Sequence, residues 1–307
     1  MCHQNDEVQS IKEEILKLKD DRCALILAHY YQRPEIQDIA DYVGDSLELS
    51  RTAAKTDKEV IVFCGVHFMA ESAAILSPDK TVLIPDVTAG CPMADMVTKE
   101  VLIAKKKEMR DATVVTYVNS SAEVKAESDI CCTSANAVKI VKSIPEGRNI
   151  LFVPDRNLGS YASLMAERKM DLWKGCCYVH DDLTSEDVKA AKKKYPKAKL
   201  LVHPECSPEV IEMADCVSST SGMLKFAKES SEGEFLVATE EGLLYQLRKQ
   251  NPNKKFYIVH EKLLCVNMKK ITLHKLKKCL INMQPCVQVS EDIRKKALLS
   301  LERMLSI

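Results

Sequence analysis

The sequence predicts an α/β fold made of three homologous units, each with a short parallel sheet covered by helices. Short apolar strands alternate with helical segments through most of the 307 residues, and this alternation is typical of parallel sheets packed between helices. One pattern recurs with a period near 87 residues, which is too long for a solenoid and indicates triplication of a small domain. If the units lie around a pseudo-threefold axis, their equivalent positions converge on that axis.

The chain begins with a helix and continues with the first unit. In segment 1–20, the apolar residues of IKEEILKLKD recur at helical spacing. In the first unit, residues 21–108, apolar runs predict strands at 23–30, 59–64 and 81–86. The segments between them predict helices at 34–43, 47–55 and 67–76.

The second and third units repeat this order. In the second unit, residues 109–195, we expect strands at 112–119 and 149–155 and helices at 122–128, 135–143 and 161–169. In the third unit, residues 196–270, we expect strands at 198–203, 234–239 and 256–260 and helices at 208–215, 222–230 and 241–250. Residues 271–307 are expected to form two amphipathic helices that pack on the repeats.

Chemically active residues recur in register in the three units. The first strand of each unit ends in an imidazole or a phenol, a hydroxyl follows 17 residues later, and a cysteine follows after about 60 residues. These residues are His29, Ser46 and Cys91, then Tyr117, Ser134 and Cys177, then His203, Thr220 and Cys265. Right-handed crossovers place the turns after parallel strands at the carboxyl edge of each sheet, where ligands bind. The sequence therefore predicts a ligand site at these edges.

The cysteines in register suggest an iron–sulfur cluster. Three thiolates hold a cubane cluster and leave one iron without a protein ligand, so that this iron can act as a Lewis acid. In the second unit both Cys176 and Cys177 are available, and the repeat spacing slightly favours Cys177. Other cysteines also fall near predicted turns, so that a different ligand set is conceivable from spacing alone: Cys131, Cys132, Cys206 and Cys216.

The hydroxyls and the remaining polar groups suit a small anion. Each hydroxyl begins a predicted helix, where it can cap the helix or join the backbone N–H groups in binding a carboxylate or phosphate. His203 and Glu205 pair an imidazole with a carboxylate at a strand end, as acid–base catalysis requires. Tyr31 and Asn119 add a phenol and an amide to the same kind of turn. Together these residues indicate an enzyme that handles a small, multiply charged anion.

Composition argues against several classes of partner. The formal net charge is zero, so neither nucleic acid nor an anionic membrane is expected as the main partner. No apolar stretch is long enough to span a bilayer, and MCHQNDEVQS lacks the apolar core of a signal peptide. We therefore expect a cytoplasmic protein, whose 13 cysteines are thiols, metal ligands or small core residues and form no disulfide framework.

Several motifs together resemble a known family. The run HYYQRPEIQDIADYVGDSLELSR, followed by AGCPMAD, TYVNSSAEVKAESDICCTSANA, HPECSPEV, SSTSGM and CVNMKKITL, resembles quinolinate synthase, the A protein of bacterial and archaeal NAD biosynthesis. The resemblance covers roughly residues 20–275. It implies three homologous three-layer α/β/α domains around a pseudo-threefold axis, and one [4Fe-4S] cluster per chain with three cysteine ligands and one open iron.

The resemblance also implies a reaction. Family members condense iminosuccinate, also called iminoaspartate, with dihydroxyacetone phosphate to quinolinate, phosphate and water. L-aspartate oxidase or aspartate dehydrogenase is the expected source of the unstable iminosuccinate. Two alternatives stay open from the residues alone. One is a cluster-dependent hydro-lyase that acts on another small dicarboxylate, and the other is an iron–sulfur or zinc sensor without turnover.

Carried over by motif, the resemblance assigns roles to the residues in register. The cluster ligands are Cys91, Cys177 and Cys265. The substrate-binding positions are His29, Ser46, Tyr117, Asn119, Ser134, His203, Glu205 and Thr220. Tyr31 and Glu205 match residues that transfer protons, and we expect His203 to assist Glu205. In the middle unit the family pattern is Gly, any residue, Cys and usually Pro-Val-His, which supports Cys177, although Tyr178 replaces the proline.

Overall fold

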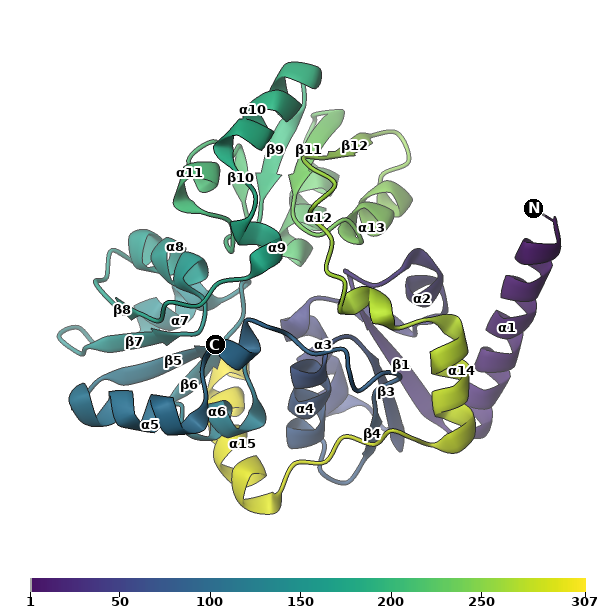
Figure 1. Cartoon of the computed structure of the whole chain (residues 1–307), viewed down its shortest axis with the longest axis horizontal. Coiled ribbons are helices and arrows are strands. Elements are labelled where there is room, and N and C mark those ends of the chain that lie inside the picture. The colour runs from purple at the N-terminus through teal and green to yellow at the C-terminus, as the bar shows by residue number, and fades with distance from the viewer. Residues whose placement is uncertain (1) are drawn as a thin grey trace. The chain divides into compact units, whose positions relative to one another are not determined.

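The protein contains three four-stranded sheets with helices on their faces (Figure 1). The computed structural model describes residues 2–307, with side chains from residue 7 onward. All strand pairs within the three sheets are parallel. The predicted α/β class with three parallel sheets is therefore confirmed. By compactness the chain divides into one unit that ends at Cys91 and resumes for Val266–Lys295, and a second with Pro92–Cys265 and Lys296–Ile307.

The first unit contains one sheet, in the order β2-β1-β3-β4. Its strands are β1 (Ala24–His29), β2 (Tyr42–Gly44), β3 (Val60–Cys64) and β4 (Thr81–Leu83). Its helices are α1 (Cys2–Asp21), α2 (Pro34–Ile39), α3 (Ser46–Lys55), α4 (His67–Leu76), the 3₁₀ helix η2 (Met268–Lys270) and α14 (Leu273–Asn282). The helix predicted in segment 1–20 is therefore present.

The second unit contains two sheets of the same topology, β6-β5-β7-β8 and β10-β9-β11-β12. Sheet two has β5 (Thr113–Tyr117), β6 (Ile130–Cys132), β7 (Ile150–Val153) and β8 (Asp171–Leu172), with η1 (Ala94–Met96), α5 (Lys99–Glu108), α6 (Ala122–Ala126), α7 (Ala137–Ser143), α8 (Arg156–Ala166) and α15 (Glu291–Leu305). Sheet three has β9 (Lys199–Val202), β10 (Cys216–Val217), β11 (Glu234–Ala238) and β12 (Lys255–Ile258), with α9 (Tyr178–Asp181), α10 (Ser185–Lys194), α11 (Pro208–Ile211), α12 (Thr220–Glu229) and α13 (Leu243–Gln250).

One hydrogen-bonded pair occurs at the same place in every sheet. In sheet one, the backbone N–H of Ile26 donates to the Asp41 carboxylate over 2.8 Å, and the backbone N–H of Asp41 donates to the Ile26 carbonyl over 2.9 Å. The same double link joins Val114 with Asp129 in sheet two, and Leu200 with Asp215 in sheet three. Each pair is 15 residues apart. The sequence repeat is thus a structural repeat down to single hydrogen bonds.

The core of the first unit forms where side chains on one face of sheet one meet helices from both ends of the chain. Ile26 on β1 and Val62 on β3 point to the same face and are fully buried, as alternation along the strands requires. They pack in one cluster with Ile15 of α1 and Leu276 of α14. Each such aliphatic side chain contributes about 1.5–3 kcal/mol through burial. Helix α14, from the late segment of the chain that belongs to this unit, therefore helps to stabilise sheet one (Figure 1).

Four of the edge strands depart from the sequence analysis. The helix predicted at 34–43 ends at Ile39, and Tyr42–Gly44 form β2 instead. The strands β6, β8 and β10 were not predicted either; they contain only 2–3 residues. A strand of this length has no readable period, and pairing with its longer neighbour decides its conformation. The helix predicted at 161–169 is also longer at its start, because the Asp155 carboxylate caps α8.

The two helices predicted within residues 271–307 are confirmed as α14 and α15. Leu276 and Leu280 of α14 join the core of sheet one. In α15, the Ser300 hydroxyl donates to the backbone carbonyl of Lys125 over 2.9 Å, which ties this helix to sheet two's α6. None of the described helices combines the length and the apolarity that crossing a bilayer requires.

Candidate functional site

The strand-to-helix turns after β1 and β9 orient their histidines in the same way. The backbone N–H of Tyr31 donates to Nδ1 of His29 over 3.1 Å, and the backbone N–H of Glu205 donates to Nδ1 of His203 over 3.4 Å. In a neutral ring this contact places the hydrogen on Nε2, and a protonated ring carries a hydrogen on Nε2 as well. In both buried histidines Nε2 is therefore a hydrogen-bond donor.

The lead residue of each repeat is the one that ends its first strand: His29, Tyr117 or His203. A side chain eight residues after the lead residue stabilises two of these turns. Gln37 is buried on α2, and its Nε2 donates to the carbonyl of Gln32 over 2.9 Å. At the equivalent position of the second repeat, the fully buried Lys125 donates through Nζ to the carbonyl of Ser120. The third repeat has Ile211 at this position. The two polar side chains hold the backbone of the turns that carry the predicted site residues.

Unpartnered polar atoms gather in these same turns. Within the described side chains, four buried nitrogen or oxygen atoms have no hydrogen-bond partner: Gln32 Oε1, Asn119 Oδ1, Ser120 Oγ and Glu205 Oε1. All four follow a lead residue by two or three positions. Buried polar groups in native proteins are nearly always hydrogen-bonded, so an unpartnered group indicates a missing ligand or water molecule. The concentration at the strand ends makes these turns the candidate binding site.

Glu205 belongs to a chain of hydrogen bonds in the second unit. Its Oε2 lies 2.7 Å from His180 Nδ1, and His180 Nε2 lies 2.9 Å from the Thr239 hydroxyl. The His180 ring stacks on His203 with 4.6 Å between the ring centroids. The sequence analysis assigned no role to His180 or to Thr239. The one available signal was the position of His180 three residues after Cys177.

The surroundings favour the charged form of Glu205 and disfavour the charged form of Asp155. Burial acts to raise the pKa of Glu205, but His180, through its charge and hydrogen bond, and the charge of His203 outweigh it and lower the pKa to about 2. A hydrogen bond from Tyr117 acts in the same direction. Burial and the charge of Glu205 raise the pKa of Asp155 well above its ordinary value. Such a divergence between neighbouring carboxyls is typical of functional sites.

The three cysteines in register follow equivalent backbone hydrogen bonds. In each repeat, the carbonyl two residues before the cysteine accepts a backbone N–H group. The donor lies at or just before the start of the helix that follows β3, β7 or β11. The pairs are His67 N with Ala89 O at 2.8 Å, Arg156 N with Gly175 O at 2.8 Å, and Glu241 N with Leu263 O at 2.9 Å. Cys91, Cys177 and Cys265 are all partly buried. They occupy matching positions in the three repeats.

Buried carboxylates hold two of these cysteine turns. The backbone N–H of Cys177 donates to Asp155 Oδ2 over 3.2 Å, and that of Cys265 donates to Glu240 Oε1 over 3.1 Å. Gly175 is required in the first of these turns, because a Cβ atom there would lie 2.5 Å from the carbonyl oxygen of Pro154. In the first repeat, the position that matches Asp155 and Glu240 belongs to Val66.

Two of the predicted hydroxyls do not cap their helices. Asp45 caps α3 through the backbone N–H groups of Leu47 and Glu48, so that Ser46 is the first residue inside the helix. Ser219 caps α12 in the same way, one position before Thr220. Ser134 lies in the turn before α7, outside the helix. Capping, one of the two alternatives for these hydroxyls, is therefore not their role: Asp45 and Ser219 reach the free N–H groups of α3 and α12 instead.

The second unit brings several predicted residues together. Tyr117 contacts Glu205, which lies beside His203. The Tyr178 hydroxyl lies 4.0 Å from Cys265 Sγ. Cys177, His180 and Glu205 form a group that could hold a metal ion, with their ligand atoms within 4.8 Å of one another. Four other predicted residues belong to the first unit: His29, Tyr31, Ser46 and Cys91.

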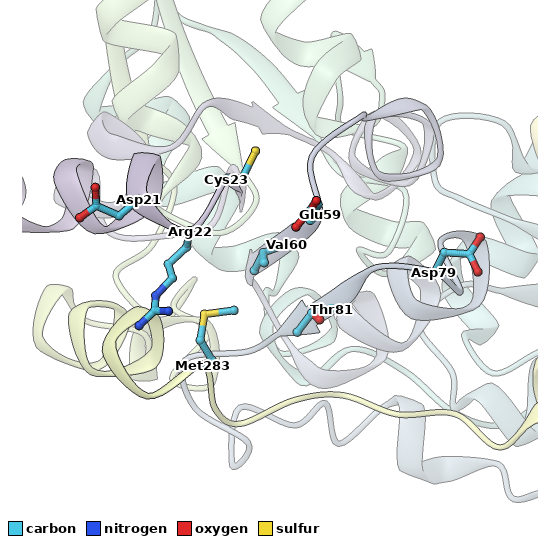
Figure 2. Close-up of a pocket in the computed structure, with 8 residues that line it drawn as sticks. All are labelled: Asp21, Arg22, Cys23, Glu59, Val60, Asp79, Thr81 and Met283. Carbon is cyan, nitrogen blue, oxygen red and sulfur yellow. The ribbon is translucent and has the colours of Figure 1, made fainter.

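A hollow at the opposite edge of sheet one contains none of the predicted residues. It has a volume of about 600 Å³ and lies at the amino ends of β1, β3 and β4 (Figure 2). Its lining residues are Asp21, Arg22, Cys23, Glu59, Val60, Asp79, Thr81 and Met283. Arg22 points toward the α14 side, where it donates to the Ile281 carbonyl over 3.4 Å. Ligands of parallel sheets bind at the carboxyl edge, so this hollow is not the candidate site.

Comparison with known proteins is consistent with this geometry. The family model described as quinolinate synthetase A protein matches residues 13–306. A quinolinate synthase of Desulforudis audaxviator is 58% identical over 96% of this chain and 97% of its own length. Quinolinate synthase 2 of Methanosarcina acetivorans is 53% identical, and the Dehalococcoides mccartyi quinolinate synthase is 55% identical, each over 97–98% of both chains. As its motifs predict, the chain belongs to the quinolinate synthetase A protein family.

Proposed function

We propose that this chain is a quinolinate synthase that condenses iminosuccinate with dihydroxyacetone phosphate, producing quinolinate, phosphate and water. One observation carries the substrate class: the four unpartnered buried polar atoms of the described side chains lie at strand ends, in the turns that follow His29, Tyr117 and His203. Iminosuccinate has two carboxylates and the second substrate has a phosphate, so both need several hydrogen-bond donors. The imidazole Nε2–H groups and the backbone at helix starts supply them.

We propose Cys91, Cys177 and Cys265 as the ligands of one [4Fe-4S] cluster. Their partly buried thiols and matching turn positions fit a cluster held by three thiolates. The backbone link from Cys177 to Asp155 matches that from Cys265 to Glu240, which supports Cys177 over Cys176. When bound, the cluster supplies a Lewis acid through its open iron. The pseudo-threefold convergence of the cysteines stays a prediction.

The proposed roles of the other residues follow from their positions. Glu205 is the principal base and His203 assists it, while Tyr31 moves a proton near the phosphate end of the substrate. The proposed substrate-binding residues are His29, Ser46, Tyr117, Asn119, Ser134, His203, Glu205 and Thr220. The division into segments 1–20, 21–108, 109–195, 196–270 and 271–307 also stays a prediction.

The proposed substrates imply a cellular setting. Iminosuccinate hydrolyses readily, so we propose that an L-aspartate oxidase or aspartate dehydrogenase supplies it close to this enzyme. A cytoplasmic location would suit both this supply and the reducing conditions that cluster thiolates need.

The decisive experiment is anaerobic reconstitution with iron and sulfide, followed by an assay of quinolinate formed from dihydroxyacetone phosphate and freshly generated iminosuccinate. We expect product only from protein that carries the cluster. Cys91→Ala, Cys177→Ala and Cys265→Ala should lose it, and Cys176→Ala is the matched control that should keep it. A cluster that forms without any quinolinate would contradict the proposal and favour a hydro-lyase acting on another dicarboxylate.

A further inference from the structure

Three ligand atoms of the second unit converge independently of the first unit. His180 Nδ1 lies 3.3 Å from Cys177 Sγ and 2.7 Å from Glu205 Oε2. His180 and Glu205 are almost completely buried, with 1% and 3% of their surface exposed, and Cys177 is partly buried. A thiolate, an imidazole and a carboxylate around one point are a frequent ligand set for zinc.

Two of the three donor–donor distances are close to those of a metal site, and all three ligand atoms lie within 4.8 Å of one another. Tetrahedral Zn²⁺, with bonds of about 2.0 Å to nitrogen and oxygen and about 2.3 Å to sulfur, separates its ligand atoms by roughly 3.3–3.5 Å. The distance from His180 Nδ1 to Cys177 Sγ already fits, at 3.3 Å. The distance to Glu205 Oε2 must increase by about 0.6 Å, which a small rotation of the carboxylate provides.

Two further features point to a cation. Glu205 Oε1 is buried and has no hydrogen-bond partner among the described residues, so this carboxylate still has an unused acceptor. His180 Nε2 is already linked to the Thr239 hydroxyl at 2.9 Å. A ligating histidine usually makes such a bond through its second ring nitrogen, which orients the first nitrogen toward the metal.

We propose that the cluster-free protein binds one zinc ion through Cys177 Sγ, His180 Nδ1 and the Glu205 carboxylate, with water as the fourth ligand. The thiolate and the carboxylate together carry two negative charges, which Zn²⁺ neutralises inside a buried site. Mixed sulfur, nitrogen and oxygen donors favour zinc over the hard cations Mg²⁺ and Ca²⁺.

Zinc at this site would compete with cluster assembly, because it occupies Cys177, and it would also occupy the proposed base Glu205. This consequence rests on the proposed function, in which Cys177 is a cluster ligand and Glu205 a base. The zinc site itself does not rest on it. Zinc binding would therefore hold part of the apoprotein in an inactive form from which iron is excluded.

The test uses Co²⁺ as a spectroscopic probe for zinc, added to the cluster-free full-length chain under anaerobic conditions. We expect one equivalent to bind with the sulfur-to-cobalt charge-transfer and strong d–d bands of a tetrahedral thiolate site, and Zn²⁺ to displace it. His180→Ala and Glu205→Gln should weaken Co²⁺ binding by about 100-fold or more, since each removes a ligand. Thr239→Val, which removes only the supporting bond, should weaken it by about 10- to 100-fold.

The matched controls are Cys91→Ala and Cys265→Ala, which should bind Co²⁺ as the wild type does. Loss of binding in these two variants, with retention in His180→Ala, would assign the metal to the three cluster cysteines and overturn the proposal. Circular dichroism of each apoprotein shows whether a variant has kept its fold.

A second readout separates the zinc site from the proposed function. Preloading with one equivalent of Zn²⁺ should reduce iron uptake during reconstitution at least 10-fold in the wild type, but not in His180→Ala. Co²⁺ binding with unimpaired iron uptake would support the zinc site and overturn the competition, and with it the assignment of Cys177 to the cluster.

Discussion

The backbone N–H of Cys177 donates to the carboxylate of Asp155 over 3.2 Å, and the Asp155 carboxyl is completely buried. Cys265 and Glu240 form the same link one repeat later, at 3.1 Å. In the first repeat the position belongs to Val66, whose side chain has no acceptor. Two of the three cysteine turns are thus held by buried carboxylates that spacing in the sequence does not reveal.

Asp155→Asn should impair the cluster. An amide at this position can accept only one of the two N–H groups, from Leu158 and Cys177, that the carboxylate now accepts. Leaving one of them unpaired costs about 1–3 kcal/mol. We expect less iron and sulfide per chain after anaerobic reconstitution, and an altered cluster absorption spectrum.

Asp129→Asn is the matched control for this prediction. The Asp129 carboxylate also accepts a backbone N–H, that of Val114, but at the first half of β5 and outside the cysteine turns. It should lower stability without lowering iron content. Equal iron content in wild type, Asp155→Asn and Asp129→Asn would refute the role of Asp155.

The unpartnered atoms at Asn119 and Ser120 predict a separation of activity from stability. Asn119→Ala should lower kcat/KM by roughly 10- to 100-fold through loss of a hydrogen bond to substrate, with little change in melting temperature. Ser120→Ala should raise stability by up to about 1 kcal/mol, because it removes a buried hydroxyl without a partner. Asn251→Ala is the control: Asn251 Nδ2 bonds the Leu247 carbonyl over 2.9 Å, so its loss should lower stability alone. If Asn119→Ala lowered only the stability and Asn251→Ala lowered kcat/KM, the result would contradict the candidate site.

Lys269 should position the turn that carries Tyr31. Its Nζ donates to the Tyr31 carbonyl over 2.7 Å, and its own carbonyl accepts from Arg33 Nε over 2.9 Å. Lys269→Met removes the first contact, and a displaced catalytic group costs up to about 100-fold in rate. We expect kcat to fall by roughly 10-fold, with a shifted pH–rate profile and unchanged cluster content. The exposed Lys278→Met is the control, and a wild-type kcat and pH profile in Lys269→Met would disprove the role.

The start of α10 should be sensitive to acid. Burial acts to raise the pKa of Asp187, but hydrogen bonds from Lys262 and Thr184 outweigh it and lower the pKa to about 2. His260 lies 3.8 Å from the same carboxylate. Because the folded-state pKa is below that of the unfolded chain, the stabilisation is present above about pH 4 and is lost as the pH falls toward 2.

The matched variant for this prediction is Asp187→Asn. At neutral pH it should lower the local stability of α10 by about 1 kcal/mol, the usual value of a helix cap. Near pH 2 the wild type and the variant should converge. Hydrogen exchange of the amides at the start of α10 measures this difference, and a difference that does not depend on pH would contradict the electrostatic origin.

The long strands and the repeat could be predicted because their signals are local. Runs such as 60–64 are apolar throughout, which is typical of a strand buried on both faces. Four of the edge strands, β2, β6, β8 and β10, could not be predicted. Tyr42–Gly44 pairs with β1 in parallel register, and only this pairing makes the segment a strand. The same limit explains the helix wrongly extended to residue 43.

The sequence alone determined the chemistry at the strand ends: which turns carry imidazoles, hydroxyls and thiols, and the family to which these motifs belong. It could do so because parallel topology sends every such turn to one edge of its sheet. Only the tertiary structure decided which side chains support them. Thr239 meets His180 from 59 residues away, and Asp155 meets Cys177 from 22 residues away. Contacts of this kind depend on how neighbouring elements pack, and no local periodicity encodes them.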